Sequence, residues 1–152
     1  MKLTRPLLLR ATVAGAALAL VAGCAGMRSS SSSHSDTYEA TLSPASEVPA
    51  TQSSGTGKAE VQVDTSNYKL RWKVTYSGLT GPATMGHIHG PAAAGANAKV
   101  QVPFTNVTSQ PITGEQQLTA AQYADLAAGL YYVNIHTARY PAGEIRGQLR
   151  KH

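Results

Sequence analysis

The chain has 152 residues, with 13 lysines and arginines, 8 aspartates and glutamates, and one cysteine. Three of the basic residues lie within the first ten positions, so the rest of the chain carries ten basic and eight acidic side chains. This small excess, without a basic stripe interleaved with aromatic residues, argues against a nucleic-acid partner. The single cysteine excludes a disulfide within the chain.

The N-terminal stretch has the pattern of a secretory signal. Lys2, Arg5 and Arg10 come before an almost wholly small and apolar segment,. This segment has about 12 apolar residues, too few for the roughly 20 that a membrane-spanning helix needs. Residues 21–24, Val-Ala-Gly-Cys, resemble the bacterial lipobox. The resemblance implies that residues 1–23 are removed and that Cys24 is lipidated.

A serine-rich segment follows the expected lipid anchor. Residues 24–36 are predicted to tether the lipid to a folded domain at 37–152,. Ala25 is not the aspartate that typically retains lipoproteins at the inner membrane. We therefore expect an exported protein on the outer membrane, facing the periplasm, or on the cell surface of a bacterium with one membrane. His34 and His152 are interpreted as solvated tail residues.

The domain region contains a succession of strand patterns. Apolar and polar residues alternate in each, with the period of two that marks a half-buried strand. Strands are predicted at 38–42, 58–64, 68–76, 85–90, 100–104, 112–118, 131–136 and 144–149. A helix is predicted at 120–128, with Thr119 as N-cap and Gly129 just beyond its end,.

Strands at such even spacing, with so little helix, predict an all-β domain. We expect an antiparallel sandwich or barrel of about eight strands with one short helix. The alternation assigns one face of each strand to the core. The residues expected inside are Trp72, Val74, Ile88, Val133, Ile135, Ile145 and Leu149.

Two of the predicted strands place histidines on the same face. His87 and His89 flank the inward Ile88, and His136 follows the inward Ile135. Residues two apart on a strand are roughly 6 to 7 Å apart at their Cα atoms, so both imidazoles can reach one metal ion. With His136 as the third ligand, the pattern predicts a three-histidine metal site on the outer face of a sheet.

Residues 137–143 contain turn residues that favour an antiparallel hairpin between the last two strands,. This hairpin puts Glu144, Arg146 and Gln148 on the same outer face as His136. Glu144 is a candidate for orienting an imidazole through a hydrogen bond. A surface ion pair between Glu144 and Arg146, worth roughly 0 to 1 kcal/mol, is an equal alternative.

Four segments resemble the CHRD domain, first named in chordin and common in bacterial secreted proteins. They are HIHGPA at 87–92, LTA at 118–120, YVNIHT at 132–137 and GEIRGQL at 143–149. The likeness extends over nearly all of residues 38–149. It implies an extracellular module and no settled activity.

A more distant resemblance is to copper/zinc superoxide dismutase, a Greek-key β-sandwich. His87, His89 and His136 are similar in order and strand phase to copper ligands of that family, and Arg146 is similar to the arginine that draws in superoxide. Between His89 and His136, however, the chain has no histidine to bridge two metals, and it lacks the zinc-ligand cluster and the disulfide cysteines. The resemblance therefore implies a copper-only version.

Three functions stay open. Imidazole nitrogen suits copper best and zinc next, and copper would permit redox turnover whereas zinc would act only as a Lewis acid. No GxSxG elbow, P-loop, dinucleotide fingerprint or HExxH motif is present,. The candidates are a copper-dependent superoxide dismutase, a copper storage or delivery protein, and a non-enzymatic interaction module whose histidines stabilise the fold through hydrogen bonds.

Overall fold

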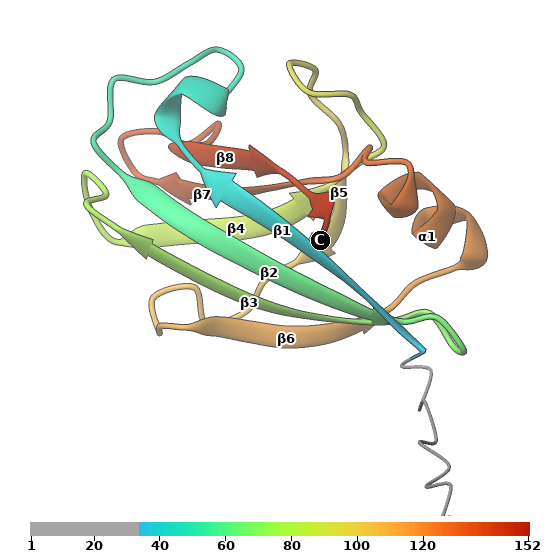
Figure 1. Ribbon diagram of the computed structural model, residues 1–152. Coiled ribbons are helices and arrows are strands. Elements are labelled where there is room, and N and C mark those ends of the chain that lie inside the picture. Colours follow the sequence, from blue (N-terminus) through green and yellow to red (C-terminus); the bar gives the residue numbers. More distant parts are fainter. Residues whose placement is uncertain (1–33) are drawn as a thin grey trace, which may run out of the picture. The chain divides into compact units, whose positions relative to one another are not determined.

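The computed structural model describes residues 34–152 (Figure 1). These residues form nine strands, one short α-helix and one 3-10 turn, which confirms the all-β prediction. The expected signal segment, Cys24 and most of the expected tether lie outside the described residues. None of the helices in the described part of the chain has the length and apolar character needed to cross a membrane.

Two antiparallel sheets form the sandwich. The first has the order β6 (Ile112–Gln117), β3 (Lys69–Ser77), β2 (Thr56–Asp64), β1 (Ser35–Leu42) and β9 (Arg150–Lys151). The second has the order β5 (Val100–Pro103), β4 (Ala83–His89), β7 (Tyr132–Thr137) and β8 (Ile145–Gln148). β1, β2 and β3 are neighbours in chain order, and after β8 the chain returns as β9 beside β1, which is the Greek-key order that the dismutase resemblance implies,.

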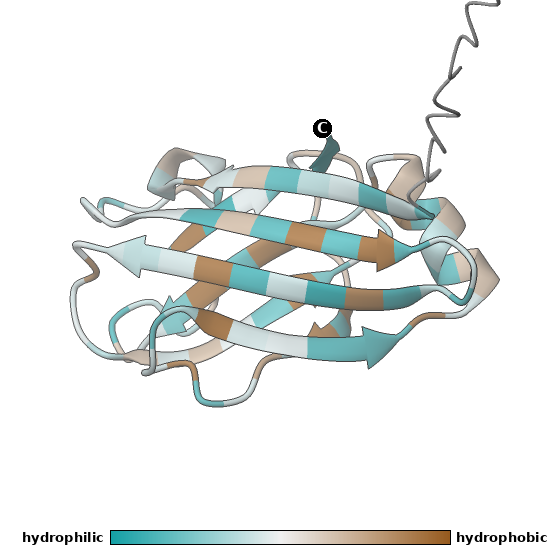
Figure 2. Cartoon of the chain, turned by 60° about the horizontal axis from the view of Figure 1, so that its bottom comes forward, coloured by the Kyte–Doolittle hydropathy of each residue, from teal (hydrophilic) through white to brown (hydrophobic). Residues whose placement is uncertain are grey.

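The core lies between the two sheets, where the inward faces of the strands meet. Figure 2 shows the resulting alternation of hydrophobic and hydrophilic residues along β2 and β3. Trp72 of β3 stacks on Phe104 with ring centroids 5.1 Å apart. Its register partner on β6 is Gly114, where a Cβ would collide with the indole. All seven residues predicted for the core are buried.

The helix α1 (Ala120–Ala127) begins and ends as its sequence predicts. Thr119 and Gln122 form a capping box, in which each side chain accepts a hydrogen bond from the backbone N–H of the other,. Gly129 follows with a φ of +74°, a conformation that favours glycine,. The 3-10 turn η1 (Pro44–Ser46) and the two-residue β9 were not predicted, because segments this short show no periodicity,.

Two loops cover the outer face of the second sheet (Figure 1). One runs from residue 43 to 55 between β1 and β2, and the other from 90 to 99 between β4 and β5. Asn97 Nδ2 of the second loop donates to Val48 O of the first at 3.0 Å. Gln148 of β8 donates to Ala92 O at 3.0 Å. Over β7 and β8 the outer face of this sheet is therefore enclosed by backbone from both loops, whereas Met85 of β4 stays exposed.

Candidate metal centre

The three histidines meet on two neighbouring strands of the second sheet. β4 and β7 pair antiparallel, and this register puts His87, His89 and His136 on the same face. His87 Nδ1 lies 3.0 Å from His136 Nε2. One nitrogen from each of the three rings lies within 4.8 Å of the other two. The predicted convergence of the three imidazoles is confirmed.

Backbone carbonyls fix the tautomers of two of the rings. His89 Nδ1 lies 3.0 Å from Ala98 O, and His136 Nδ1 lies 3.0 Å from Pro141 O. A carbonyl oxygen only accepts, so each Nδ1 carries the hydrogen and each Nε2 keeps a lone pair. Both lone pairs point into the cluster, as metal ligands require.

Burial keeps all three imidazoles neutral at neutral pH. Desolvation, together with the neighbouring His136 and His89, lowers the pKa of His87 to about 4. Desolvation is also the main cause that lowers the pKa of His89 and that of His136. Neutral imidazole is the form that binds a metal, so no proton has to leave these ligands before binding at neutral pH.

The expectation that this face is open to solvent is wrong. His89 is 8% exposed and His136 is 5% exposed, while His87 is half-buried. All six residues of β7 are buried. Alternation of side chains predicts which side of a sheet a residue faces, whereas loops decide whether that side meets water. The histidines face outward from the sheet into a layer of loop backbone.

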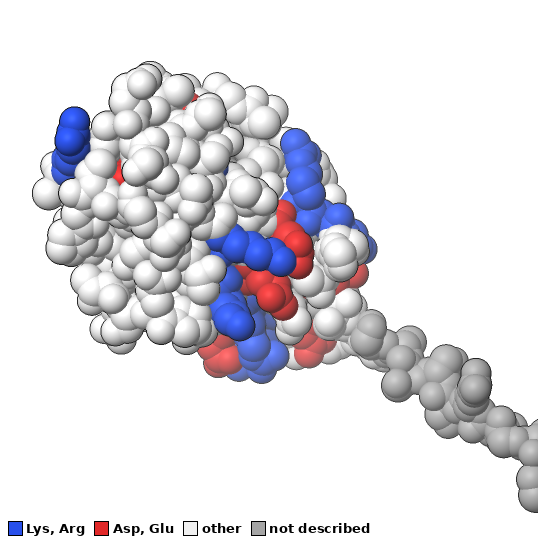
Figure 3. All heavy atoms as spheres, turned by 60° about the vertical axis from the view of Figure 1, so that its left-hand side comes forward, with Lys and Arg blue, Asp and Glu red and all other residues white. Residues whose placement is uncertain are grey.

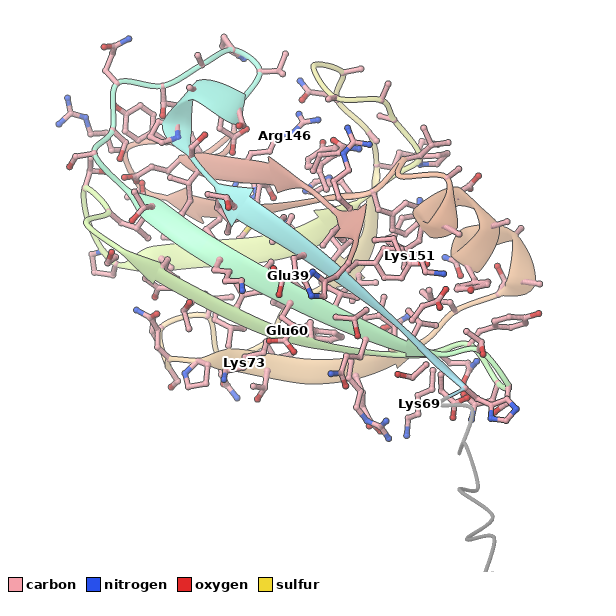
Figure 4. All side chains as sticks on the ribbon, in the orientation of Figure 1. Glu39, Glu60, Lys69, Lys73, Arg146 and Lys151 are labelled. Atoms are coloured by element: carbon pink, nitrogen blue, oxygen red, sulfur yellow. The ribbon has the colours of Figure 1, made fainter. Side chains whose placement is uncertain are left out.

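Arg146 is also enclosed, which corrects its expected position as an open guide for anions. Its side chain, labelled in Figure 4, is 2% exposed. The guanidinium donates to Ala96 O at 2.7 Å and to Asn97 Oδ1 at 3.0 Å. It lies 3.3 Å from the centroid of the Tyr132 ring, and the same ring stacks on His89 at 4.8 Å. Arg146 therefore holds the 90–99 loop and reaches the metal centre through Tyr132.

Glu144 contacts none of the histidines, so its predicted role in orienting an imidazole is wrong. Its fully buried carboxylate accepts hydrogen bonds from Ser53, Thr137 and both the N–H and hydroxyl of Thr80. Burial alone would raise the pKa of Glu144, but these donors outweigh it and hold the pKa below its ordinary value. The carboxylate joins the 43–55 loop and the loop after β3 to the end of β7, and it forms no surface ion pair with Arg146.

Sequence reasoning missed two polar residues beside the cluster. Asn134 Oδ1 lies 2.9 Å from His89 Nε2 and 3.0 Å from His136 Nε2. Its outward phase on the strand of His136 was the available signal. Glu47, in the 43–55 loop, is 7% exposed, and burial raises its pKa to about 7 against the opposing charge of Arg146. An irregular loop gives no pattern from which such burial can be predicted.

Comparison with protein families places this site within a known domain. The model of the CHRD domain matches residues 38–149. The chain belongs to the CHRD domain family. The CHRD match includes the whole second sheet and all three clustered histidines, so the candidate metal centre is part of the domain itself. No curated protein and no solved structure matches the chain.

Proposed function

We propose that this CHRD domain binds one copper ion through His87 Nδ1, His89 Nε2 and His136 Nε2, and that it acts as a copper-only superoxide dismutase. The observation that carries the proposal is the convergence of three neutral imidazole nitrogens within 4.8 Å. In the metal-free protein, His87 Nδ1–H donates to the lone pair of His136 Nε2. For His87 Nδ1 to bind a metal ion, this hydrogen moves to Nε2 of the same ring, so the imidazole stays neutral.

The chemistry of the donor set fits copper best. Three imidazoles suit copper and zinc, and the order of divalent affinities favours copper. Copper supplies two oxidation states, so that one superoxide can be oxidised and the next reduced. Ala98 O and Pro141 O hold the rings of His89 and His136. An anion reaches the cluster from the side of His87, its most exposed member.

The charge of Arg146 supports anion binding without direct contact. Burial is the main cause that lowers the pKa of His89, and the charge of Arg146 lowers it slightly further. A fixed positive charge beside a site raises the local concentration of small anions. In this role Arg146 favours the approach of superoxide while its hydrogen bonds stay on Ala96 and Asn97.

Copper storage or delivery is the second candidate. The burial of His89 and His136 favours it, because a ligand enclosed by loops slows the exchange of metal and limits access by substrates. Storage needs the same three ligands and no turnover. The two candidates therefore differ in superoxide decay and not in copper stoichiometry.

The test measures bound copper and superoxide decay on the purified mature chain. Wild type should bind one equivalent of copper and accelerate superoxide decay, and His89→Ala and His136→Ala should lose the metal. His152→Ala is the matched control, since this histidine is exposed at the chain end and should leave both unchanged. Copper at one equivalent without superoxide decay would support storage. If wild type binds neither copper nor zinc at micromolar concentration, the metal proposal fails and the interaction module is left.

We also propose that the chain is exported and anchored by a lipid on Cys24, on the outer membrane and facing the periplasm. The signal-like segment and the lipobox pattern support this proposal,. Cys24→Ser should release a soluble or unprocessed form and abolish incorporation of labelled fatty acid. A variant that stays lipid-modified in the membrane fraction would contradict it.

A further inference from the structure

Four polar side chains, and not three, converge on the outer face of β4 and β7. Asn134 is the direct cross-strand partner of His87 and lies two residues before His136 on the same strand. Its Oδ1 is 2.9 Å from His89 Nε2 and 3.0 Å from His136 Nε2. His87 Nδ1 lies 3.0 Å from the same His136 nitrogen. Asn134 therefore belongs to the cluster as closely as any histidine does.

The orientation of the Asn134 amide brings lone pairs together. Since Ala98 O and Pro141 O take up the Nδ1 hydrogens, His89 Nε2 and His136 Nε2 have none to donate,. Asn134 Oδ1 also has only lone pairs. Of these three acceptors, His136 Nε2 receives a hydrogen from His87 Nδ1. Asn134 Oδ1 and His89 Nε2 face each other without one and repel in a low-dielectric interior, and a cation between them removes that repulsion. The arrangement is that of a metal-ligand set.

Glu47 accounts for this orientation of the amide. Its Oε1 is buried and has no hydrogen-bond partner among the described residues. Glu47 Oε1 and Asn134 Nδ2 both lie against Gly143, where a Cβ would overlap the carboxyl oxygen and lie 2.9 Å from Nδ2. A carboxyl oxygen facing the amide favours Nδ2, whose hydrogens can be accepted, over Oδ1. With Glu47 on this side, the orientation in which Oδ1 faces the histidines would be favoured.

Gly143 makes this approach possible. Its φ is +134°, in the region that favours glycine, and the missing Cβ leaves the space in which Glu47 and Asn134 lie side by side,. The turn between β7 and β8 therefore brings the 43–55 loop close to the metal centre.

We propose that Asn134 Oδ1 is the fourth donor to the copper ion, and that Glu47 is a positioning residue that sets the Asn134 amide. This inference rests on the proposed copper site. Two donors at right angles, each about 2.1 Å from a metal ion, are about 3 Å apart. The distances from Asn134 Oδ1 to His89 Nε2 and to His136 Nε2, 2.9 and 3.0 Å, agree with that value. Nitrogen and oxygen donors in tetragonal geometry favour Cu(II), so Asn134 should stabilise Cu(II) more than Cu(I).

The test compares the Cu(II) and Cu(I) affinities of the mature chain by chelator competition. In Asn134→Leu we expect Cu(II) affinity to fall about 10- to 100-fold while Cu(I) affinity changes less than about threefold. Asn134→Asp keeps an oxygen donor and adds a negative charge, so it should raise the Cu(II)-to-Cu(I) affinity ratio. Glu47→Leu should weaken Cu(II) by a smaller factor, because the amide is then free to turn. Each change should also alter the Cu(II) electron paramagnetic resonance spectrum.

The matched control is Asn97→Leu, which removes an amide from the covering loop that faces Arg146 and not the histidines. It should change both affinities equally or not at all. Asn134→Leu that binds Cu(II) like wild type, or that loses both oxidation states in the same proportion, would overturn the assignment. If Asn134→Leu does not fold, an unchanged Cu(II)-to-Cu(I) affinity ratio in Asn134→Asp would do so. Failure of wild type to bind copper would instead remove the proposed function.

Discussion

The outer faces of the two sheets carry the same alternation in sequence and have opposite environments in the structure. On the first sheet, Lys73 is exposed and its register partner Glu60 is half-exposed, beside other charged side chains of both signs (Figures 3 and 4). Exposed ion pairs such as Lys69–Glu115, at 2.6 Å, lie on this face. On the second sheet every residue of β7 is buried. The alternation of residues predicts on which side of a sheet each side chain lies, but not whether other parts of the chain cover that side.

The difference comes from the connections. β2 and β3 are joined by a tight turn at 65–68, which leaves the outer face of the first sheet bare. The 43–55 and 90–99 loops cross the second sheet and bring backbone carbonyls and hydroxyls to its polar side chains. Because a buried polar group costs free energy unless it is hydrogen-bonded, the covered face depends on each of these partners. Substitutions on the two faces should therefore differ greatly in effect.

The largest difference is expected between Glu144→Ala and Glu60→Ala. Removing the Glu144 carboxylate leaves the buried hydroxyl of Thr137 and the part-buried hydrogen bonds from Ser53 and Thr80 without an acceptor, which should lower the free energy of unfolding by about 4 kcal/mol,. Glu60→Ala, on the exposed face, should change it by less than about 0.5 kcal/mol. Urea denaturation of the metal-free proteins measures both. Equal effects would show that the loops do not carry the stability assigned to them.

The stability difference between wild type and Glu47→Gln, a substitution on the covered face, should depend on pH. The folded pKa of about 7 lies above the ordinary value of 4.5, so the folded state binds more protons than the unfolded state between these pH values,. Wild type and variant should be similarly stable below pH 4.5. As pH rises through 7, wild type should lose up to about 3 kcal/mol relative to the variant. Thermal unfolding from pH 4 to pH 8 checks this, and a constant difference would contradict the burial of this carboxyl.

The sequence predicted what depends on local periodicity. The strands, the Thr119 cap and the side of the sheet that His87, His89 and His136 share could all be read from alternation and capping. The enclosure of Arg146 and Glu144 could not, because both are covered by irregular loops far away in sequence. Such contacts depend on the path of a loop, which no short-range pattern determines.

Arg146→Ala should destabilise the covered face by about 2 kcal/mol, since it removes charged hydrogen bonds to Ala96 and Asn97 and the contact with Tyr132,. The released loop should be cleaved more quickly by protease within residues 90–99. Copper affinity should also fall, because Ala98 O then holds His89 less firmly. A variant with native stability and intact copper binding, but slower superoxide decay, would instead restore the simpler role of a guiding charge.

Lys73→Ala should have the smallest effect on the free energy of unfolding. It compares a basic side chain on the exposed face, Lys73, with one on the covered face, Arg146. Lys73 is exposed near the middle of β3, so its substitution should change the free energy of unfolding by less than about 0.5 kcal/mol,. The core separates Lys73 from Arg146, and packed sheets lie about 10 Å apart. The double variant with Arg146→Ala should therefore show the sum of the single effects to within about 0.5 kcal/mol. Urea denaturation of all four proteins measures this coupling. Because no direct contact joins the two positions, a larger value would mean that a change on the covered face alters the first sheet through the core.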